Sequence, residues 1–219
     1  MRAQTDRALL QHLRSYRNDP VGYARDILGI TFTPDQASIA HHLLIAPYRV
    51  LVPSGHSTGK TCAAAALASW WYDTRNPGAV FSLGPRHDSL KDTLWGEIRM
   101  QRLRAPVRLP SHFVGPSAPE MRSSPVHWAK ALTAAKDASL TGRHLPDMLF
   151  ILEEACAIDP IWWQVVQTMF DPSLGHAMLA IFNPTDPTSQ AFAEDADSET
   201  DGARSWHRFR LSALNHPHI

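Results

Sequence analysis

The most informative stretch of the sequence is RVLVPSGHSTGKT, residues 49–61. It begins with a short apolar run, Arg49–Val52, that is typical of a buried strand. A glycine-containing loop follows, and an alanine-rich segment then favours a helix from Lys60 to about Tyr72. The loop matches the phosphate-binding pattern G-x-x-x-x-G-K-[ST], except that Ser54 stands at the first glycine. The order strand, loop, helix argues against the alternative, which is a chance glycine-rich turn.

The loop predicts a site for the phosphates of a nucleotide. In such loops, successive backbone N–H groups and the N-terminus of the following helix bind the polyphosphate. Lys60 would reach the β- and γ-phosphates, and the Thr61 hydroxyl would ligate Mg²⁺. The residues predicted to bind the nucleotide are Ser54, Gly55, His56, Ser57, Thr58, Gly59, Lys60 and Thr61.

An acid pair supplies a second signal. The most hydrophobic run of the chain, Met148–Leu152, is predicted to be a central strand and ends in Glu153 and Glu154. Two unpaired carboxylates would be costly to bury there. A site in which Glu153 serves Mg²⁺ and Glu154 polarises an attacking water is therefore the favoured interpretation. The alternative is a pair of carboxylates that cap the helix predicted to follow.

Strands and helices alternate along the rest of the chain. Further strands are predicted at Ala79–Leu83, Val126–Thr133, Ala177–Phe182 and Trp206–Leu211. Helices are predicted at 6–17, 20–28, 34–44, 88–100 and 161–170, whereas 105–125 is expected to be irregular and 186–204 to be a polar, acidic loop or surface turn. Strands separated by helices imply a mostly parallel sheet with helices on both faces. The predicted fold class is α/β, specifically a P-loop NTPase of the RecA/ASCE type.

Composition narrows the class of protein. Of 219 residues, 44% are hydrophobic and 19% charged, which is enough apolar material for a core and excludes disorder. No apolar run approaches the roughly 20 residues of a membrane span, and the charged N-terminus lacks the apolar middle of a signal peptide. Cys62 and Cys156 are the only cysteines, which excludes a disulfide framework and a Cys-rich zinc site. We expect a cytosolic protein without a membrane partner.

Five segments together point to one family. They are DPVGYARDILGITFTPDQ (19–36), VLVPSGHSTGKT (50–61), SLGPRHDSLKDTLWGEI (82–98), SLTGRHLPDMLFILEEA (139–155) and AIFNPTDPTSQAF (180–192). In these segments the chain resembles the N-terminal ATPase domain of a phage terminase large subunit, the motor that packages DNA into proheads. The resemblance covers nearly the whole chain. It departs from the family at Glu153, where the usual acid pair begins with Asp.

The resemblance assigns roles to three further residues. Gln36 would contact adenine, the alternative being a solvent-facing helix residue. Asn183 would couple the γ-phosphate to the rest of the domain, the alternative being a simple Asn-Pro turn. Arg143, which lies next to Gly142 on the approach to the acid pair, would act as an arginine finger in its own site or a neighbour's.

The resemblance also implies a domain organisation. Residues 1–219 would form a single ATPase domain, with a helical lead-in at 1–48 that carries Gln36 and a core at 49–212. Residues 213–219 would begin the linker to a nuclease domain that this sequence lacks, so we expect no nuclease activity.

The implied function is Mg²⁺-dependent ATP hydrolysis that powers translocation of viral double-stranded DNA into a prohead. The implied partners are the DNA, the portal protein and the small terminase subunit, and the cofactors are ATP and Mg²⁺. The chain would be a monomer in isolation and a homo-oligomeric ring on the portal, in the host cytoplasm. Two alternatives stay open: a fragment of a superfamily-2-like helicase, although the chain has no room for the second RecA-like half, and a nucleotide-binding assembly scaffold without efficient turnover.

Overall fold

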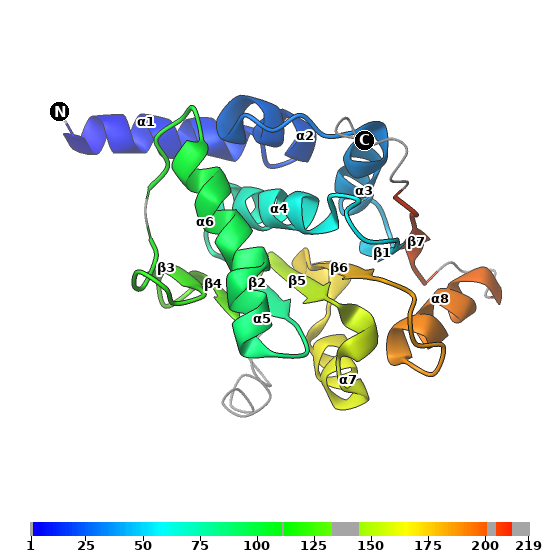
Figure 1. Cartoon of the computed structure of the whole chain (residues 1–219). Helices are drawn as coiled ribbons and strands as arrows, with labels where there is room; N and C mark the ends of the chain where they lie inside the picture. Colours follow the sequence, from blue (N-terminus) through cyan, green and yellow to red (C-terminus); the bar gives the residue numbers. More distant parts are fainter. Residues whose placement is uncertain (1, 111, 133–144, 201–204, 212–219) are drawn as a thin grey trace.

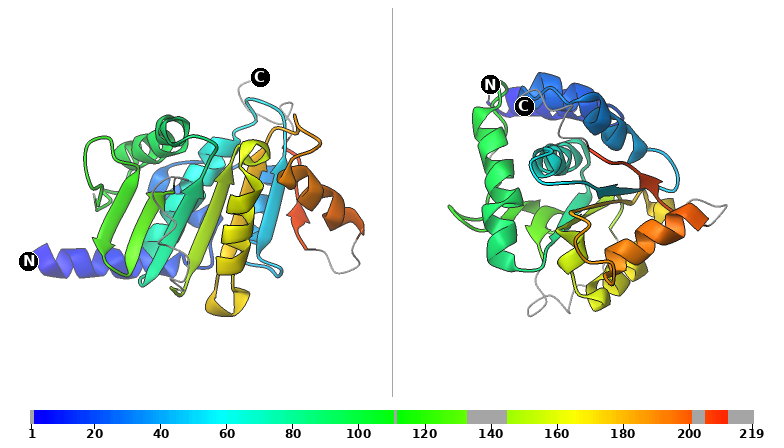
Figure 2. Two further views of the ribbon diagram at one scale, coloured as in Figure 1. Left: turned by 90° about the horizontal axis from the view of Figure 1, so that it is seen from below. Right: turned by 45° about the vertical axis from the view of Figure 1, so that its right-hand side comes forward.

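The computed structural model describes residues 2–110, 112–132, 145–200 and 205–211. Their seven strands form one sheet in the order β3-β4-β2-β5-β6-β1-β7, seen side by side in Figure 2. All neighbouring strands are parallel except β3 and β4, which are antiparallel. The strands are β1 (Arg49–Pro53), β2 (Gly78–Leu83), β3 (Glu120–Ser124), β4 (His127–Ala131), β5 (Met148–Glu153), β6 (Ala177–Phe182) and β7 (His207–Arg208).

Helices cover both faces of this sheet. On one face lie α1 (Arg2–Ser15), α2 (Pro20–Tyr23), the π-helical segment η1 (Ala24–Leu28), α3 (Pro34–His42), α4 (Lys60–Thr74), α5 (His87–Asp92) and α6 (Leu94–Arg104). The other face carries α7 (Pro160–Met169) and α8 (Gln190–Thr200), with short 3-10 turns at η3 (Ala155–Ala157) and η4 (Pro172–Leu174) (Figure 1). The predicted α/β class and mostly parallel sheet are confirmed.

The strand sequences explain the two layers. Every residue of β2, β5 and β6 is buried, as expected of parallel strands covered on both faces. Because side chains alternate along a strand, Leu149 and Ile151 join the core under α4, whereas Phe150 joins the core under α7. The alanine run of α4 is buried throughout, and its small side chains let this helix lie close against the centre of the sheet.

Two predicted elements in the middle of the chain differ from the structure. The helix expected over 88–100 is two helices, α5 and α6, which meet at Thr93. The stretch 105–125, expected to be irregular, contains β3, an edge strand in which only Met121 is fully buried. This strand is stabilised by its hydrogen-bond ladder with β4 and stays largely exposed, so its sequence has no apolar run that would predict it.

The C-terminal part differs as well. The acidic stretch 186–204 contains α8, because its carboxylates have tertiary partners: Glu194 accepts a hydrogen bond from Trp206 Nε1 at 2.8 Å, and Asp195 accepts one from Arg208 Nη2 at 2.7 Å. The last strand is only His207–Arg208, paired with β1. Residues 213–219, expected to begin a linker, lie outside the described residues. Among the described residues, no helix has the length and apolar character needed to cross a membrane.

A buried ion pair joins the helices on the α4 face. Arg102 of α6 donates from Nη1 to Asp73 Oδ2 of α4 at 2.7 Å, and the side chains of both residues are only 4% exposed. The hydroxyl of Tyr23 donates to the same carboxylate at 2.5 Å. The ion pair of Arg102 and Asp73, with the hydroxyl of Tyr23, therefore connects α2, α4 and α6.

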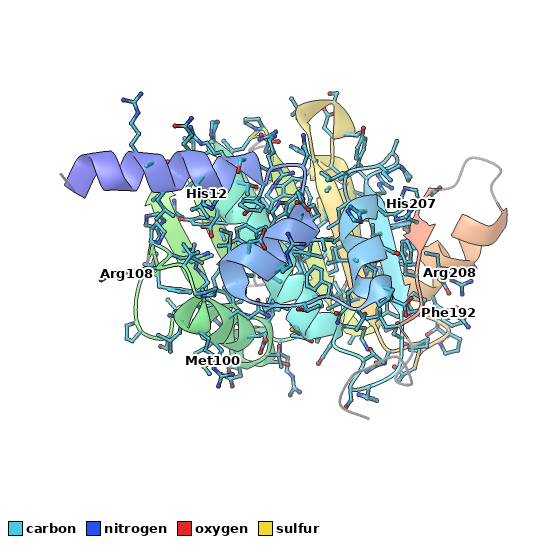
Figure 3. All side chains as sticks on the ribbon, turned by 90° about the horizontal axis from the view of Figure 1, so that it is seen from above. His12, Met100, Arg108, Phe192, His207 and Arg208 are labelled. Carbon is cyan, nitrogen blue, oxygen red and sulfur yellow. The ribbon has the colours of Figure 1, made fainter. Side chains whose placement is uncertain are left out.

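Arg108, beyond the end of α6, lies on the opposite side of the molecule from Arg208 of β7 (Figure 3).

We expect Arg102→Ala to lower the free energy of unfolding by about 3–5 kcal/mol, because it leaves the buried Asp73 carboxylate without its counter-charge. Urea denaturation measures this loss. The matched control is Arg104→Ala on the exposed end of the same helix, with an expected change within about 0.5 kcal/mol. Equal losses in the two variants would contradict the role of the pair.

Candidate nucleotide-binding site

The phosphate loop connects the carboxyl end of β1 to the first residue of α4. Gly59 has a φ of 74°, in the left-handed region that glycine adopts without strain, and Ser57 also has a positive φ of 57°. These two residues curve the loop over the end of the sheet, so that α4 begins at Lys60 as predicted. The free N–H groups of the first turn of α4 therefore face the loop, which is the arrangement that binds anions.

Lys60 folds back over its own loop. Its Nζ donates to Ser54 O at 3.0 Å and to Asn183 Oδ1 at 2.9 Å, and it also contacts Gly55 O. These acceptors are neutral, and burial lowers the pKa of the amine from its usual value. A half-buried cation whose hydrogen-bond acceptors in the described part of the chain are neutral is well placed to exchange them for the oxygens of a phosphate.

Asn183 follows β6 and lies beside the loop, as predicted for a site residue. Its Oδ1 accepts from Lys60, and its Nδ2 lies 3.1 Å from Nδ1 of His56. The side chain therefore bridges the loop and the end of the neighbouring strand. A simple Asn-Pro turn would not require either contact.

Glu153, the last residue of β5, is held from two sides. Thr61 Oγ1 donates to Glu153 Oε1 at 2.9 Å, and Thr93 Oγ1 donates to Oε2 at 3.0 Å. The carboxylate is buried, with Glu153 only 5% exposed. Burial is the main reason why its pKa is raised, with the charge of Glu154 adding to the effect, while the donated hydrogen bonds oppose it.

The pair of Thr61 and Glu153 fits a magnesium ion by the chemistry of its donors. Hydroxyl and carboxylate oxygens suit Mg²⁺, which takes one or two protein ligands and completes its shell with water and phosphate oxygens. Among the described residues there is no group of three or more His, Cys, Asp or Glu side chains that could hold a metal ion by themselves. A cation held by Thr61 and Glu153 would complete its shell with water and phosphate oxygens.

Glu154 lies next to the buried acid but is exposed. It has a φ of 52°, so the chain turns sharply at the end of β5 before η3 begins. Both acids contribute to one cavity of about 350 Å³ at the carboxyl ends of β1, β5 and β6. Its other lining residues are His56, Ser57, Thr58, Gly59, Lys60, Thr61, Cys62, Thr93, Ile181, Phe182 and Asn183.

Gln36 is close to the loop but does not line this cavity. It is 6% exposed, so the alternative of a solvent-facing side chain is wrong. Its Nε2 donates to Gly59 O at 3.3 Å, while its Oε1 accepts from Thr33 N at 3.0 Å in a capping box that starts α3. The contact with adenine stays a prediction. Arg143 lies outside the described residues.

Sequence reasoning missed two parts of the site. Thr93 gave no motif signal, because it lies inside a stretch that reads as one helix. The second is the partner of Ser54, whose hydroxyl accepts a hydrogen bond from the backbone N–H of Leu211 at 2.7 Å. The serine at the usual glycine position thus ties the phosphate loop to the segment that follows β7.

Solved structures of phage large terminases share this fold. The large terminase of the thermophilic bacteriophage D6E has a TM-score of 0.65 at 14% identity, over 85% of this chain and 47% of that protein. The ATPase domain of the Thermus phage P74-26 large terminase has a TM-score of 0.64 at 17% identity, over 86% of this chain and 84% of that domain. The HK97 bacteriophage large terminase has a TM-score of 0.58 at 13% identity, over 88% and 42%.

The D6E protein has also been solved in complex with ADP and with ATP-gamma-S. This chain spans about half the length of the D6E large terminase. No protein-family model and no curated protein sequence matches the chain. The structural likeness shows that the chain has the P-loop NTPase fold of the phage large terminase ATPase domains.

Proposed function

We propose that this chain is the ATPase domain of a phage terminase large subunit and that it hydrolyses ATP with Mg²⁺ to power the packaging of viral double-stranded DNA. One observation carries the proposal. A single cavity collects Lys60, Thr61, Glu153, Glu154 and Asn183 at the carboxyl ends of three adjacent parallel strands. Ligands of open α/β sheets bind at such strand ends, and the likeness to the nucleotide-bound D6E terminase supports the same assignment.

The phosphate loop between β1 and α4 binds the phosphates together with Lys60. The amine leaves Asn183 and the loop carbonyls and contacts the β- and γ-phosphates, whose charge makes them stronger acceptors. Thr61 can keep its hydrogen bond to Glu153 and still offer a lone pair of its hydroxyl oxygen to a cation. The Mg²⁺ held there supplies charge neutralisation on the phosphate oxygens.

Hydrolysis falls to Glu154. Its carboxylate orients a water and accepts its proton, while the water oxygen forms a bond to the γ-phosphorus and the bond from that phosphorus to the β–γ bridging oxygen breaks. Asn183 loses the hydrogen bond from Lys60 when the phosphates bind, so it reports occupancy to the end of β6. Gln36, beside Gly59, contacts the adenine, and Arg143 adds positive charge near the γ-phosphate.

The partners follow from the same assignment. The domain acts on double-stranded DNA with the portal protein and the small terminase subunit, as a homo-oligomeric ring on the portal in the host cytoplasm, and is monomeric when isolated. The neighbours that share its fold are large terminases of bacteriophages D6E, P74-26 and HK97, which supports this assignment. Phosphate release by the purified chain, with and without double-stranded DNA, tests it against a scaffold without turnover.

The two charged site residues should fail in different ways. Glu154→Ala should lower turnover by about 10²–10⁴-fold, because it removes the proton acceptor, while nucleotide still binds. Lys60→Ala should weaken binding by roughly tenfold or more, because it removes charge-assisted hydrogen bonds worth about 1.5–3 kcal/mol. Phosphate release and titration with a fluorescent nucleotide measure the two effects.

The matched control is Asp88→Ala, whose side chain is 96% exposed and does not line the cavity. It should leave both quantities unchanged. Equal losses of affinity in the Glu154 and Lys60 variants would count against the separate roles. A wild-type chain that releases no phosphate under any of these conditions would count against the proposed function.

Arg143 should act on the site of a neighbouring subunit. A Glu154→Ala subunit, inactive in its own site, should then restore turnover when mixed with an Arg143→Ala subunit, because it supplies the missing arginine. Arginine fingers contribute about 10³–10⁵ in turnover, so specific activity should also rise with protein concentration. A specific activity that is independent of concentration, without recovery on mixing, would exclude action in trans.

A further inference from the structure

The junction between α5 and α6 lies at the nucleotide cavity. Thr93 has φ −84° and ψ −86°, outside helical geometry, although no proline or glycine occupies the position. The backbone hydrogen bonds nevertheless continue across it, from Thr93 N to Ser89 O at 2.9 Å and from Glu97 N to Thr93 O at 3.0 Å. The helix therefore bends at Thr93 without losing these bonds, and local sequence does not account for the bend.

The first turn of α6 is firmly anchored on the sheet. Leu94 and Trp95 are completely or almost completely buried, and Trp95 Nε1 donates to Ser82 Oγ of β2 at 2.9 Å. In α5, by contrast, only Leu90 is buried. Thr93 thus lies at the junction between α5, in which one residue is buried, and α6, whose first turn is packed against the sheet.

The Thr93 hydroxyl hydrogen-bonds the second carboxylate oxygen of Glu153. Thr61 donates to Oε1 of Glu153, and Thr93 donates to Oε2. Thr93 Oγ1 also lies 2.8 Å from Ser89 O, but a hydroxyl has one proton and can donate to only one acceptor at a time. A bond to a carboxylate is the stronger one, and Ser89 O keeps the bond from Thr93 N.

Because residue 153 is a glutamate, the second donor, Thr93, affects how its carboxylate is oriented. A glutamate has one more rotatable bond than the aspartate of the terminase pattern, so its carboxylate has more conformations to lose when it binds a cation. A single donor at Oε1 would leave rotation about that contact free; beside Thr93, the backbone N–H of the next residue, Leu94, also hydrogen-bonds this carboxylate. Donors on both oxygens fix the plane of the carboxylate.

We propose that Thr93 is a positioning residue that orients the Glu153 carboxylate toward the cation of a bound Mg²⁺–nucleotide. The proposal rests on the proposed function. Through Thr93 the cation site is linked to the α5–α6 junction, and so to the exposed helix α5. Thr93 itself need not touch the nucleotide or the cation.

The test compares Thr93→Val, which keeps the shape and removes the hydroxyl, with Thr93→Ser, which keeps the hydroxyl. A fluorescent ADP analogue is titrated at a series of Mg²⁺ concentrations, and the Mg²⁺ concentration that gives half of the gain in affinity is recorded. Groups that orient metal ligands contribute about 10–100-fold to metal affinity. Thr93→Val should therefore raise this concentration about tenfold, whereas Thr93→Ser should stay close to wild type.

Two controls separate positioning from general damage. Affinity for the analogue in EDTA should be the same in all variants, because the phosphate loop is untouched. Thr168→Val removes the hydroxyl of an exposed threonine in α7, which bonds Val165 O at 2.8 Å and does not line the cavity, and should leave the Mg²⁺ dependence unchanged. Thr93→Ala provides a second variant without a hydroxyl if Thr93→Val does not fold.

The outcomes distinguish the two proposals. A wild-type Mg²⁺ dependence in the variants without the hydroxyl, or a loss in Thr93→Ser as large as in Thr93→Val, would overturn the role of Thr93 and leave the proposed function intact. A wild-type protein whose nucleotide affinity does not respond to Mg²⁺ would overturn both.

Discussion

The burial of the Glu153 carboxylate is the constraint on which the site depends. A charge at the end of a fully buried strand is costly unless donors surround it. The structure supplies hydroxyls from Thr61, in the first turn of α4, and from Thr93, at the start of α6. Both helices must therefore begin over the same end of β5, and the phosphate loop comes to lie beside the acid.

The rest of the α4 face keeps those helix starts in place. The alanine run brings α4 close to the sheet, and the buried pair of Asp73 and Arg102 joins α4 to α6 near their far ends. Trp95 fixes the near end of α6 to Ser82 of β2. A site built from the termini of rigid helices and strands holds its geometry better than one built on loops. The packing of α4 and α6 against each other and against the sheet thus fixes the positions of Thr61 and Thr93 at the cavity.

Neighbouring strands connect the cavity to other parts of the domain. Asn183, at the end of β6, accepts a hydrogen bond from Lys60, and Ser54 accepts one from the backbone N–H of Leu211 beyond β7. Each contact involves a residue or an acceptor that phosphate binding would engage. The loop is therefore connected by side-chain hydrogen bonds both to the end of β6 and to the segment beyond β7.

Local chemistry was enough to predict the parts of this protein that have a strict sequence pattern. The loop ending in Lys60 and Thr61, the apolar strand ending in Glu153, and the alternation that makes a parallel sheet all depend on neighbours in the chain. Thr93, the helix α8 and the edge strand β3 could not be predicted in this way. The hydroxyl of Thr93 bonds a carboxylate 60 residues away, and the acids of α8 bond Trp206 and Arg208, whereas β3 depends on its ladder with the neighbouring strand β4. Only the folded chain brings those partners within hydrogen-bonding distance.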